Sequence, residues 1–305
     1  MSEPDPRKGH AMVKRWVWVV PVMIAFLLMG AQNHALAVHG GKKQMRKAIL
    51  LVAFGTSDAE AQKTFLRVDE QARKTFPGVE IRWAYTSKMI RKKLAREGKD
   101  LDSPEVALAK LMDEGATHVA VLSLHTIPGE EYHELYRNAH LYGLMEGGFE
   151  KILVAKPLLS SPKDMDRVAA ALLKNIPGRK PSDGVLFMGH GTEHHPADAI
   201  YLAMNQVFQD LDPNAFVGTV DGRLALKNIL QKLRSRNVGK LYLVPLMAVA
   251  GEHARKDMAG NDPESWKSIL TKNGYECEAI LKGTADCPEI LDVWLEHLRE
   301  LLSQF

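Results

Sequence analysis

The chain has 305 residues, of which 40 are Lys or Arg and 37 are Asp or Glu, so its formal net charge is +3. This near balance lacks the basic excess of a nucleic-acid-binding protein, and we expect no nucleic-acid partner. Cys277 and Cys287 are the only cysteines, and the sequence leaves open whether they pair. They form no Cys-x-x-Cys motif, which excludes a cysteine zinc knuckle and a covalently attached c-type haem.

The first forty residues differ from the rest. A basic stretch ending at Lys14-Arg15 precedes an uncharged apolar run at residues 16–29, and Ala35-Leu36-Ala37 supplies a small-x-small cleavage pattern. The run has about 14 residues, fewer than the roughly 20 that a membrane-spanning helix needs, which disfavours the alternative of a membrane anchor. We expect residues 1–37 to be a cleaved signal peptide. The mature protein would then begin at Val38 and be periplasmic, without stable membrane insertion.

Short β-branched runs alternate with longer amphipathic stretches along the mature chain, a pattern typical of parallel strands joined by crossover helices. The expected fold class is α/β, with two similar Rossmann-like domains whose parallel sheets are flanked by helices. Ser103 before Pro104 marks one helix start. A crossover after Pro157 predicts an N-terminal domain at residues 38–157 and a C-terminal domain at residues 158–305. The predicted strands are residues 47–54, 80–85, 118–124, 151–155, 185–188, 215–219, 240–245 and 276–281.

Two pairs of loops indicate that the halves repeat. Phe54-Gly55-Thr56 after the first strand matches His190-Gly191-Thr192 after the fifth. Residues 125–131 after the third strand match residues 247–253 after the seventh. In open parallel sheets ligands bind beyond the carboxyl ends of the strands, so we expect all four loops to face one cleft between the halves.

Two histidines on these loops are candidate metal ligands. His190 follows a strand and is flanked by glycines, which permit a tight turn and the close approach of a ligand. A buried, hydrogen-bonded turn histidine is the alternative. His253 occupies the place where the first half has Glu131, so these two side chains are expected to face each other across the cleft. Imidazole and carboxylate together suit a borderline divalent ion, and we predict one metal site from the three residues.

Other histidines have weaker signals. His194 and His195 fit a solvated face, because adjacent helical residues point in different directions. His133 and His140 are seven residues apart and share one face of a predicted helix. That face is either solvated or carries an extra metal or haem site with His133 as axial ligand, shared between the subunits of a homo-oligomer. Gly55-Thr56-Ser57 is a weak signal for a turn that binds a carboxylate or phosphate.

Five segments closely resemble the anaerobic-type sirohydrochlorin cobaltochelatases of vitamin B12 synthesis, which are class II tetrapyrrole chelatases. These segments are residues 51–57, 123–132, 156–161, 187–192 and 244–253. The resemblance implies a chelatase fold that encloses a tetrapyrrole, and insertion of Co²⁺ into sirohydrochlorin with release of two protons. It implies a metal site at His190, His253 and Glu131. The predicted substrate-binding residues on the matching loops are Phe54, Gly55, Thr56 and His125.

Metal insertion removes two pyrrole protons from the ring, so the enzyme needs a base and ligands that do not trap the ion. Histidine serves either purpose near neutral pH, and Glu131 adds negative charge and a proton acceptor. Members of the resembling family mostly work in the cytoplasm, whereas this chain is predicted to be an exported form. Two alternatives stay open: a periplasmic carrier of a tetrapyrrole, haem or metal, and a chelatase for Fe²⁺ or Ni²⁺.

Overall fold

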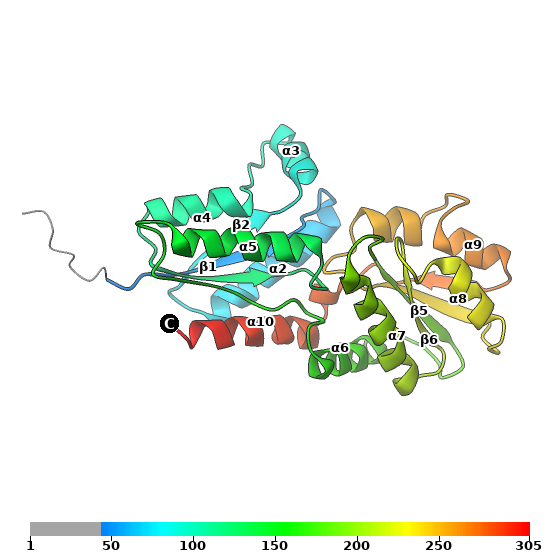
Figure 1. Cartoon of the computed structure of the whole chain (residues 1–305). Coiled ribbons are helices and arrows are strands. Elements are labelled where there is room, and N and C mark those ends of the chain that lie inside the picture. Colours follow the sequence, from blue (N-terminus) through cyan, green and yellow to red (C-terminus); the bar gives the residue numbers. More distant parts are fainter. Residues whose placement is uncertain (1–43) are drawn as a thin grey trace, which may run out of the picture. The chain divides into compact units, whose positions relative to one another are not determined.

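Residues 44–305 are described by a computed structural model, in which two four-stranded parallel sheets are flanked by helices (Figure 1). Residues 45–305 form one unit by their internal contacts. The predicted signal peptide at residues 1–37 lies outside the described residues. Among the helices of the described part, none is long and apolar enough to cross a bilayer.

The two sheets have the same topology. The first has the strand order β2-β1-β3-β4 and the second the order β6-β5-β7-β8, so each half places its first strand second in its sheet. All neighbouring strands are parallel, which confirms the predicted α/β fold class and the repeated halves. The strands are β1 (Lys47–Ala53), β2 (Glu80–Tyr85), β3 (His118–Ser123), β4 (Lys151–Val154), β5 (Gly184–Gly189), β6 (Ala215–Thr219), β7 (Lys240–Pro245) and β8 (Glu276–Ala279).

Helices cover both faces of the first sheet. Along β1, Leu50 and its alternate neighbours pack against α4 and α5, whereas Ile49 and Leu51 pack against α2 and α10. Burial on both faces explains why β1 is a continuous apolar run rather than an alternating one. The helices of this half are α2 (Ala59–Thr75), α3 (Lys88–Arg96), α4 (Pro104–Asp113) and α5 (Glu130–Leu144).

The α4 helix begins as the sequence predicts. The Ser103 hydroxyl accepts a hydrogen bond from the backbone N–H of Val106 at 3.4 Å, and Pro104 occupies the first turn. The α3 helix was not predicted. It is strongly charged and only nine residues long, shorter than the window over which helical periodicity is read from a sequence.

The second sheet is covered in the same way. Leu186 and Met188 of β5 pack against α8 and α9, and Val185 and Phe187 pack on the side of α6 and α7. The remaining elements are α6 (Pro162–Lys174), the 3₁₀ turn η1 (Pro196–Asp198), α7 (Ala199–Leu211), α8 (Leu226–Leu233), the π-helical turn η2 (Ala254–Met258), α9 (Trp266–Lys272), the 3₁₀ turn η3 (Thr284–Asp286) and α10 (Pro288–Leu302).

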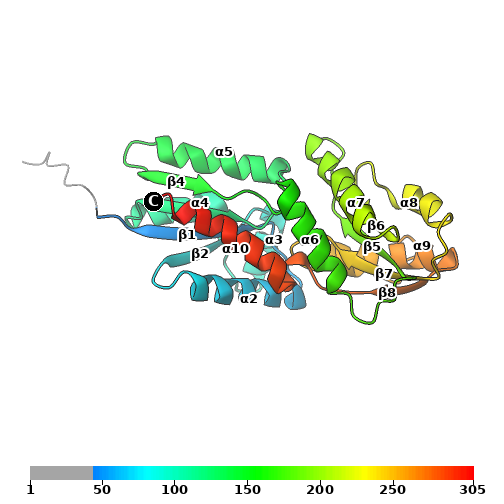
Figure 2. The same ribbon diagram turned by 90° about the horizontal axis from the view of Figure 1, so that it is seen from below.

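The last helix returns to the first half. Figure 2 shows α10 lying along the first sheet, where Leu295 and Leu298 belong to the same buried cluster as Ile49. That cluster also contains side chains of β5 and of the crossover after β4, so the halves share one core. The domain boundary between residues 157 and 158 stays a prediction. Cys277 and Cys287 are both free thiols.

Candidate active site

A large pocket lies beyond the carboxyl ends of the strands. Its volume is about 960 Å³, at the upper end of the range for small-molecule sites. The walls come from the loops after β1, β3, β5 and β7, together with one face of α3. These are the four loops that the internal repeat predicted to face one cleft.

Glycines shape the loops at equivalent places in the two halves. Gly55 follows β1 with φ +100°, and Gly191 follows β5 with φ +79°, both in the left-handed region that favours glycine. A Cβ atom on Gly55 would lie 2.5 Å from the ring of Tyr85, and one on Gly191 would lie 1.9 Å from the carbonyl oxygen of Asp221. Backbone conformation and close packing therefore both require glycine at these two positions. The residues that precede them, Phe54 and His190, line the pocket.

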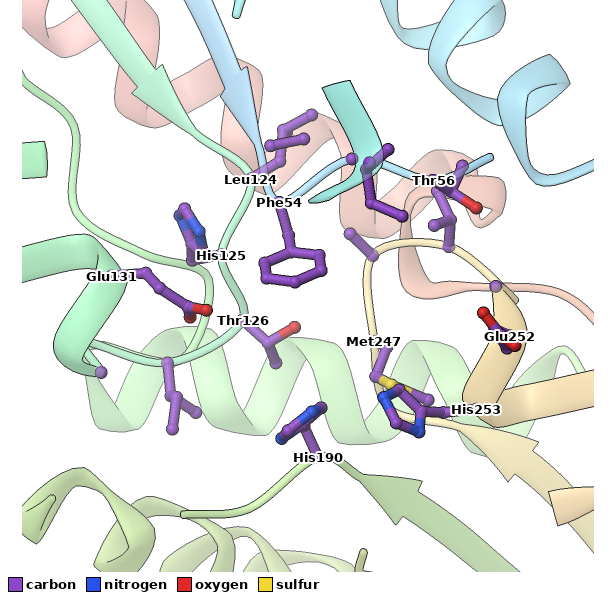
Figure 3. A pocket seen from close by; sticks show the side chains of 18 of the residues that line it. Phe54, Thr56, Leu124, His125, Thr126, Glu131, His190, Met247, Glu252 and His253 are labelled. Atoms are coloured by element: carbon purple, nitrogen blue, oxygen red, sulfur yellow. The ribbon is translucent and has the colours of Figure 1, made fainter. Parts of the chain in front are cut away.

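The pocket brings His190 and His253 together. Their rings meet edge to face with centroids 4.9 Å apart, and each side chain is about half exposed to the pocket, at 52% and 46%. Figure 3 shows the two imidazoles side by side, one from the loop after β5 and the other from the helical turn after β7. Imidazole nitrogens are common ligands of divalent ions, so the adjacent rings are candidate ligands.

Among residues 44–305, the hydrogen bonds of the two rings involve Nδ1 and leave the Nε2 atoms without a partner. Nδ1 of His190 lies 3.2 Å from the carbonyl oxygen of Gly191, and Nδ1 of His253 lies 2.5 Å from a carboxylate oxygen of Asp257. The carbonyl oxygen of Gly191 and an ionised Asp257 carboxylate can only accept hydrogen bonds. In each neutral ring the proton is therefore on Nδ1. The Nε2 lone pairs remain for a metal ion or a proton.

Glu131 enters the same pocket from the start of α5. In Figure 3 it lies apart from the histidine pair, on the side of His125. The surrounding protein desolvates the carboxylate and raises its pKa, and the proximity of His190 opposes that rise. Glu131 thus combines a pocket position with a proton affinity above that of an ordinary glutamate. Its role as a metal ligand stays a prediction.

His125 lies on the pocket wall with one ring nitrogen unpartnered. Its Nδ1 lies 2.8 Å from the hydroxyl oxygen of Ser123, whereas its buried Nε2 has no hydrogen-bond partner in the described part of the chain. Burial lowers the pKa of the imidazole to about 4, so it is neutral at physiological pH. The pocket wall therefore contains a buried, neutral imidazole.

The other predicted substrate-binding residues also lie at the pocket. Phe54 is 46% exposed, and its ring forms a flat apolar part of the pocket wall. The buried Thr56 hydroxyl accepts a hydrogen bond from the backbone N–H of Asp58 at 3.1 Å, so it also fixes the loop. Asp58 in turn forms a 3.0 Å ion pair with Arg255, which joins the loops of the two halves at the pocket edge.

The sequence did not reveal two carboxylates beside the histidine pair. Asp257 contacts Nδ1 of His253, and Asp221, in the loop after β6, lies 3.9 Å from Nδ1 of His190. Neither belongs to a recognisable motif. The i, i+4 spacing of His253 and Asp257 was the one available signal. Within residues 44–305, no group of three or more His, Cys, Asp or Glu side chains is arranged to hold a metal ion.

The other histidines that the sequence singled out lie on α5 and on the loop after β5. His133 packs against His195 with ring centroids 5.2 Å apart, and its Nδ1 lies 2.9 Å from the carbonyl oxygen of Gly129. His194 is 90% exposed, as predicted for a solvated residue. His195 differs from that prediction, because the segment before η1 is a loop in which its Nδ1 accepts a hydrogen bond from the backbone of Ala197.

The fold and its pocket define a two-domain α/β protein of the chelatase type. Solved structures of chelatases share this fold: the sirohydrochlorin chelatase SirB of Bacillus subtilis in complex with cobalt has a TM-score of 0.55 at 16% identity, covering 85% of this chain and 97% of its own. SirB with Fe³⁺ has a TM-score of 0.57 at 16% identity, covering 84% and 96%. At this identity the likeness shows the fold alone.

Sequence comparison is more specific. The family model described as "Cobalt chelatase (CbiK)" matches residues 47–303, and the chain belongs to that family. The chain is 45% identical to the sirohydrochlorin cobaltochelatase CbiKC of Nitratidesulfovibrio vulgaris over 259 residues, which is 85% of this chain and 91% of the relative. It is 35% identical to the sirohydrochlorin cobaltochelatase of Salmonella typhimurium over 261 residues, or 85% and 97%.

Proposed function

We propose that this protein is a sirohydrochlorin cobaltochelatase, a lyase that inserts Co²⁺ into sirohydrochlorin. The observation that carries the proposal is the His190–His253 pair, 4.9 Å between ring centroids, in a pocket of about 960 Å³. Family membership and two curated relatives with this activity support the substrate pair. A carrier would need ligands but no base, so the pocket carboxylate Glu131 favours an enzyme.

The residues at the pocket match the requirements of the reaction. Metal-free sirohydrochlorin loses two pyrrole protons as Co²⁺ takes their place, with no redox step. His190 and His253 offer Nε2 lone pairs that bind the ion before transfer and accept a proton after it. Glu131 lies in the same pocket and has a raised pKa, so it is a second proton acceptor. Two imidazoles hold a divalent ion less tightly than a closed four-ligand site, which favours release into the ring.

A spectroscopic assay tests this function. Purified residues 38–305 are mixed with sirohydrochlorin and Co²⁺, Fe²⁺ or Ni²⁺ in turn, and the change in ring absorption is followed against a protein-free control. Turnover with Co²⁺ ahead of the other ions is the expected result. Binding of sirohydrochlorin without faster metal insertion would contradict enzymatic function and favour the carrier. Faster insertion of Fe²⁺ or Ni²⁺ than of Co²⁺ would assign a different substrate ion to the enzyme.

We propose further that the protein is exported to the periplasm and cleaved near Ala37. The support is the basic, apolar and small-residue layout of the first 37 residues, which lie outside the described structure. Amino-terminal sequencing of the protein from a periplasmic extract tests it, with Val38 as the expected first residue. Recovery of an intact Met1 start in the membrane fraction would refute it.

A haem or second metal site at His133 is a further proposal, for a homo-oligomer. Its support is local: the Nδ1 contact with Gly129 leaves Nε2 of His133 free, and the exposed face of α5 carries the apolar side chains of Tyr136, Leu141 and Leu144. The absorption spectrum and mass of the purified assembly are compared with those of His133→Ala. The proposal would be refuted if the unchanged protein purified without haem or metal and His133→Ala assembled in the same way.

A further inference from the structure

The α3 helix carries a cluster of cations at the edge of the pocket. Lys88, Arg91, Lys92, Lys93 and Arg96 occupy five of its nine positions. None of the five forms an ion pair within 4.0 Å with another of residues 44–305. Of the twelve other Lys and Arg residues at positions 44–157, six have a carboxylate partner, so α3 combines five unpaired cations in nine positions.

One face of α3 forms part of the pocket wall. Met89, Ile90 and Lys93 line the pocket, and Met89 and Lys93 are four positions apart, which places them on the same side of the helix. Met89 is 69% exposed, so an apolar surface adjoins the lysine. Lys92 carries the same charge on the same helix but does not line the pocket. An apolar wall with a cation beside it suits a flat ring that bears acidic side chains.

The second half contributes a charged pair to the same pocket. Glu252 and Lys256 both line it and form an ion pair with each other, with side chains 60% and 71% exposed. Lys93 lines the same pocket, although α3 and the turn after β7 belong to different halves. The pocket wall therefore carries Glu252 together with two cations, Lys93 and Lys256.

We propose that Lys93 and Lys256 bind carboxylate side chains of the tetrapyrrole, and that the substrate displaces Glu252 from its ion pair with Lys256. This inference rests on the proposed function and deepens it, because it assigns recognition of the acidic ring periphery to named residues. Sirohydrochlorin bears carboxylates around its ring. An exposed ion pair such as Glu252–Lys256 is weak, so a substrate carboxylate exchanges with it readily. The unpaired cations of α3 also attract a polyanion over a longer range.

Variants of Lys93 and Glu252 should change affinity in opposite directions. Lys93→Ala removes one charge-assisted contact, and we expect the Kd for metal-free sirohydrochlorin to rise about fivefold. Lys93→Glu adds repulsion, and we expect a rise of about 30-fold. Glu252→Gln removes the internal competitor, and the Kd should fall about threefold. The measurement is a fluorescence or absorbance titration of each variant with sirohydrochlorin at low and high salt.

Two controls separate direct contact from general charge. Lys92→Ala should leave the Kd within about twofold of the original, because this lysine does not line the pocket. A porphyrin with only two carboxylates should show a smaller effect of Lys93→Ala than sirohydrochlorin does. An equal effect of the Lys92 and Lys93 variants, or weaker binding by Glu252→Gln, would overturn the assignment.

The same titrations distinguish this inference from the proposed function. If the unchanged protein binds sirohydrochlorin and inserts cobalt while Lys93→Ala binds equally well, the recognition assignment is wrong and the proposed function stands. If the unchanged protein fails to bind sirohydrochlorin at all, both are wrong. Circular dichroism of each variant confirms that the fold is retained, which the exposed positions of Lys93 and Glu252 lead us to expect.

Discussion

The rings of His190 and His253 meet edge to face at 4.9 Å between centroids, although the two residues belong to loops after different strands of the second sheet. The adjacent imidazoles are candidate ligands of one ion. The two side chains are therefore expected to act as one unit in metal capture.

Loss of either histidine should abolish most of the activity. His190→Ala and His253→Ala each remove a metal ligand and a proton acceptor, and we expect the rate of cobalt insertion to fall on the order of 100-fold. Because both act on one ion, the double variant should be within about threefold of the worse single variant. The measurement is the steady-state rate with sirohydrochlorin and Co²⁺, beside the affinity for the metal-free ring. Near-normal turnover in either single variant would refute the shared site, and strictly additive losses would show independent roles.

Asp257 should matter through His253. Its carboxylate lies 2.5 Å from Nδ1 of His253 and orients the ring, so Asp257→Asn should raise the cobalt concentration needed for half-maximal rate about tenfold. The affinity for metal-free sirohydrochlorin should be unchanged. Asp113→Asn, an exposed substitution outside the pocket lining, is the matched control. Restoration of the wild-type cobalt dependence by Asp257→Glu would support an orienting role, whereas a loss of tetrapyrrole affinity in Asp257→Asn would argue for a structural one.

Much of the fold could be predicted because its strands are buried on both faces. Residues 47–53 form an apolar run with no polar alternation, and a run of that length between turn residues predicts a parallel strand. The internal repeat also predicted which loops meet. Glu131 and His253 each lie eight residues beyond the end of their strand, β3 and β7, and both reach the pocket.

Other features have no local signal. The amphipathic pattern of α10 predicts a helix but does not say which sheet its apolar face covers, and it covers the sheet of the first half. Asp221 approaches His190 only because β6 pairs with β5, so their proximity depends on sheet order. The α3 helix has nine residues, fewer than the window over which helical periodicity is read, and its position at the pocket depends on the packing of the loop after β2.

Glu131→Gln should impair metal entry more than tetrapyrrole binding. The substitution keeps the shape and removes the charge, and we expect kcat/KM for cobalt to fall on the order of 100-fold. The pKa of Glu131 is raised by desolvation, so the carboxylate loses its charge as the pH falls through a value above that of an ordinary glutamate. The unchanged enzyme should therefore lose activity in that acid range, whereas the residual activity of Glu131→Gln should not fall over the same range. If the variant lost activity over the same pH range as the unchanged enzyme, Glu131 would be excluded as the group whose protonation causes the loss.

Stability provides the control for Glu131. Because folding raises its pKa, folding favours the protonated form, and the stability associated with this residue falls as the pH rises through the folded-state pKa. Glu131→Gln should therefore be at least as stable as the unchanged protein near neutral pH. Chemical denaturation measures this directly. Lost activity together with a lower free energy of unfolding would indicate a structural defect instead of a missing proton acceptor.

His125 should make the folded protein sensitive to mild acid. Burial lowers its pKa from 6.5 to about 4, so below the unfolded-state value the unfolded chain binds a proton that the folded protein excludes. The stability contributed by the neutral ring is full above the unfolded-state pKa and is lost as the pH falls toward the folded-state pKa. Between about pH 7 and about pH 5 the free energy of unfolding should fall by at most about 2 kcal/mol through this residue.

The variant His125→Asn tests this expectation, because asparagine stays neutral and keeps an amide near Ser123. Its free energy of unfolding should therefore lack this pH-dependent component. Urea denaturation of both proteins across this range gives the difference, and the exposed His140→Asn is the control that should leave the slope unchanged. An identical pH dependence in His125→Asn and the unchanged protein would show that the ring is protonated without cost, and so that it is open to water in the folded state.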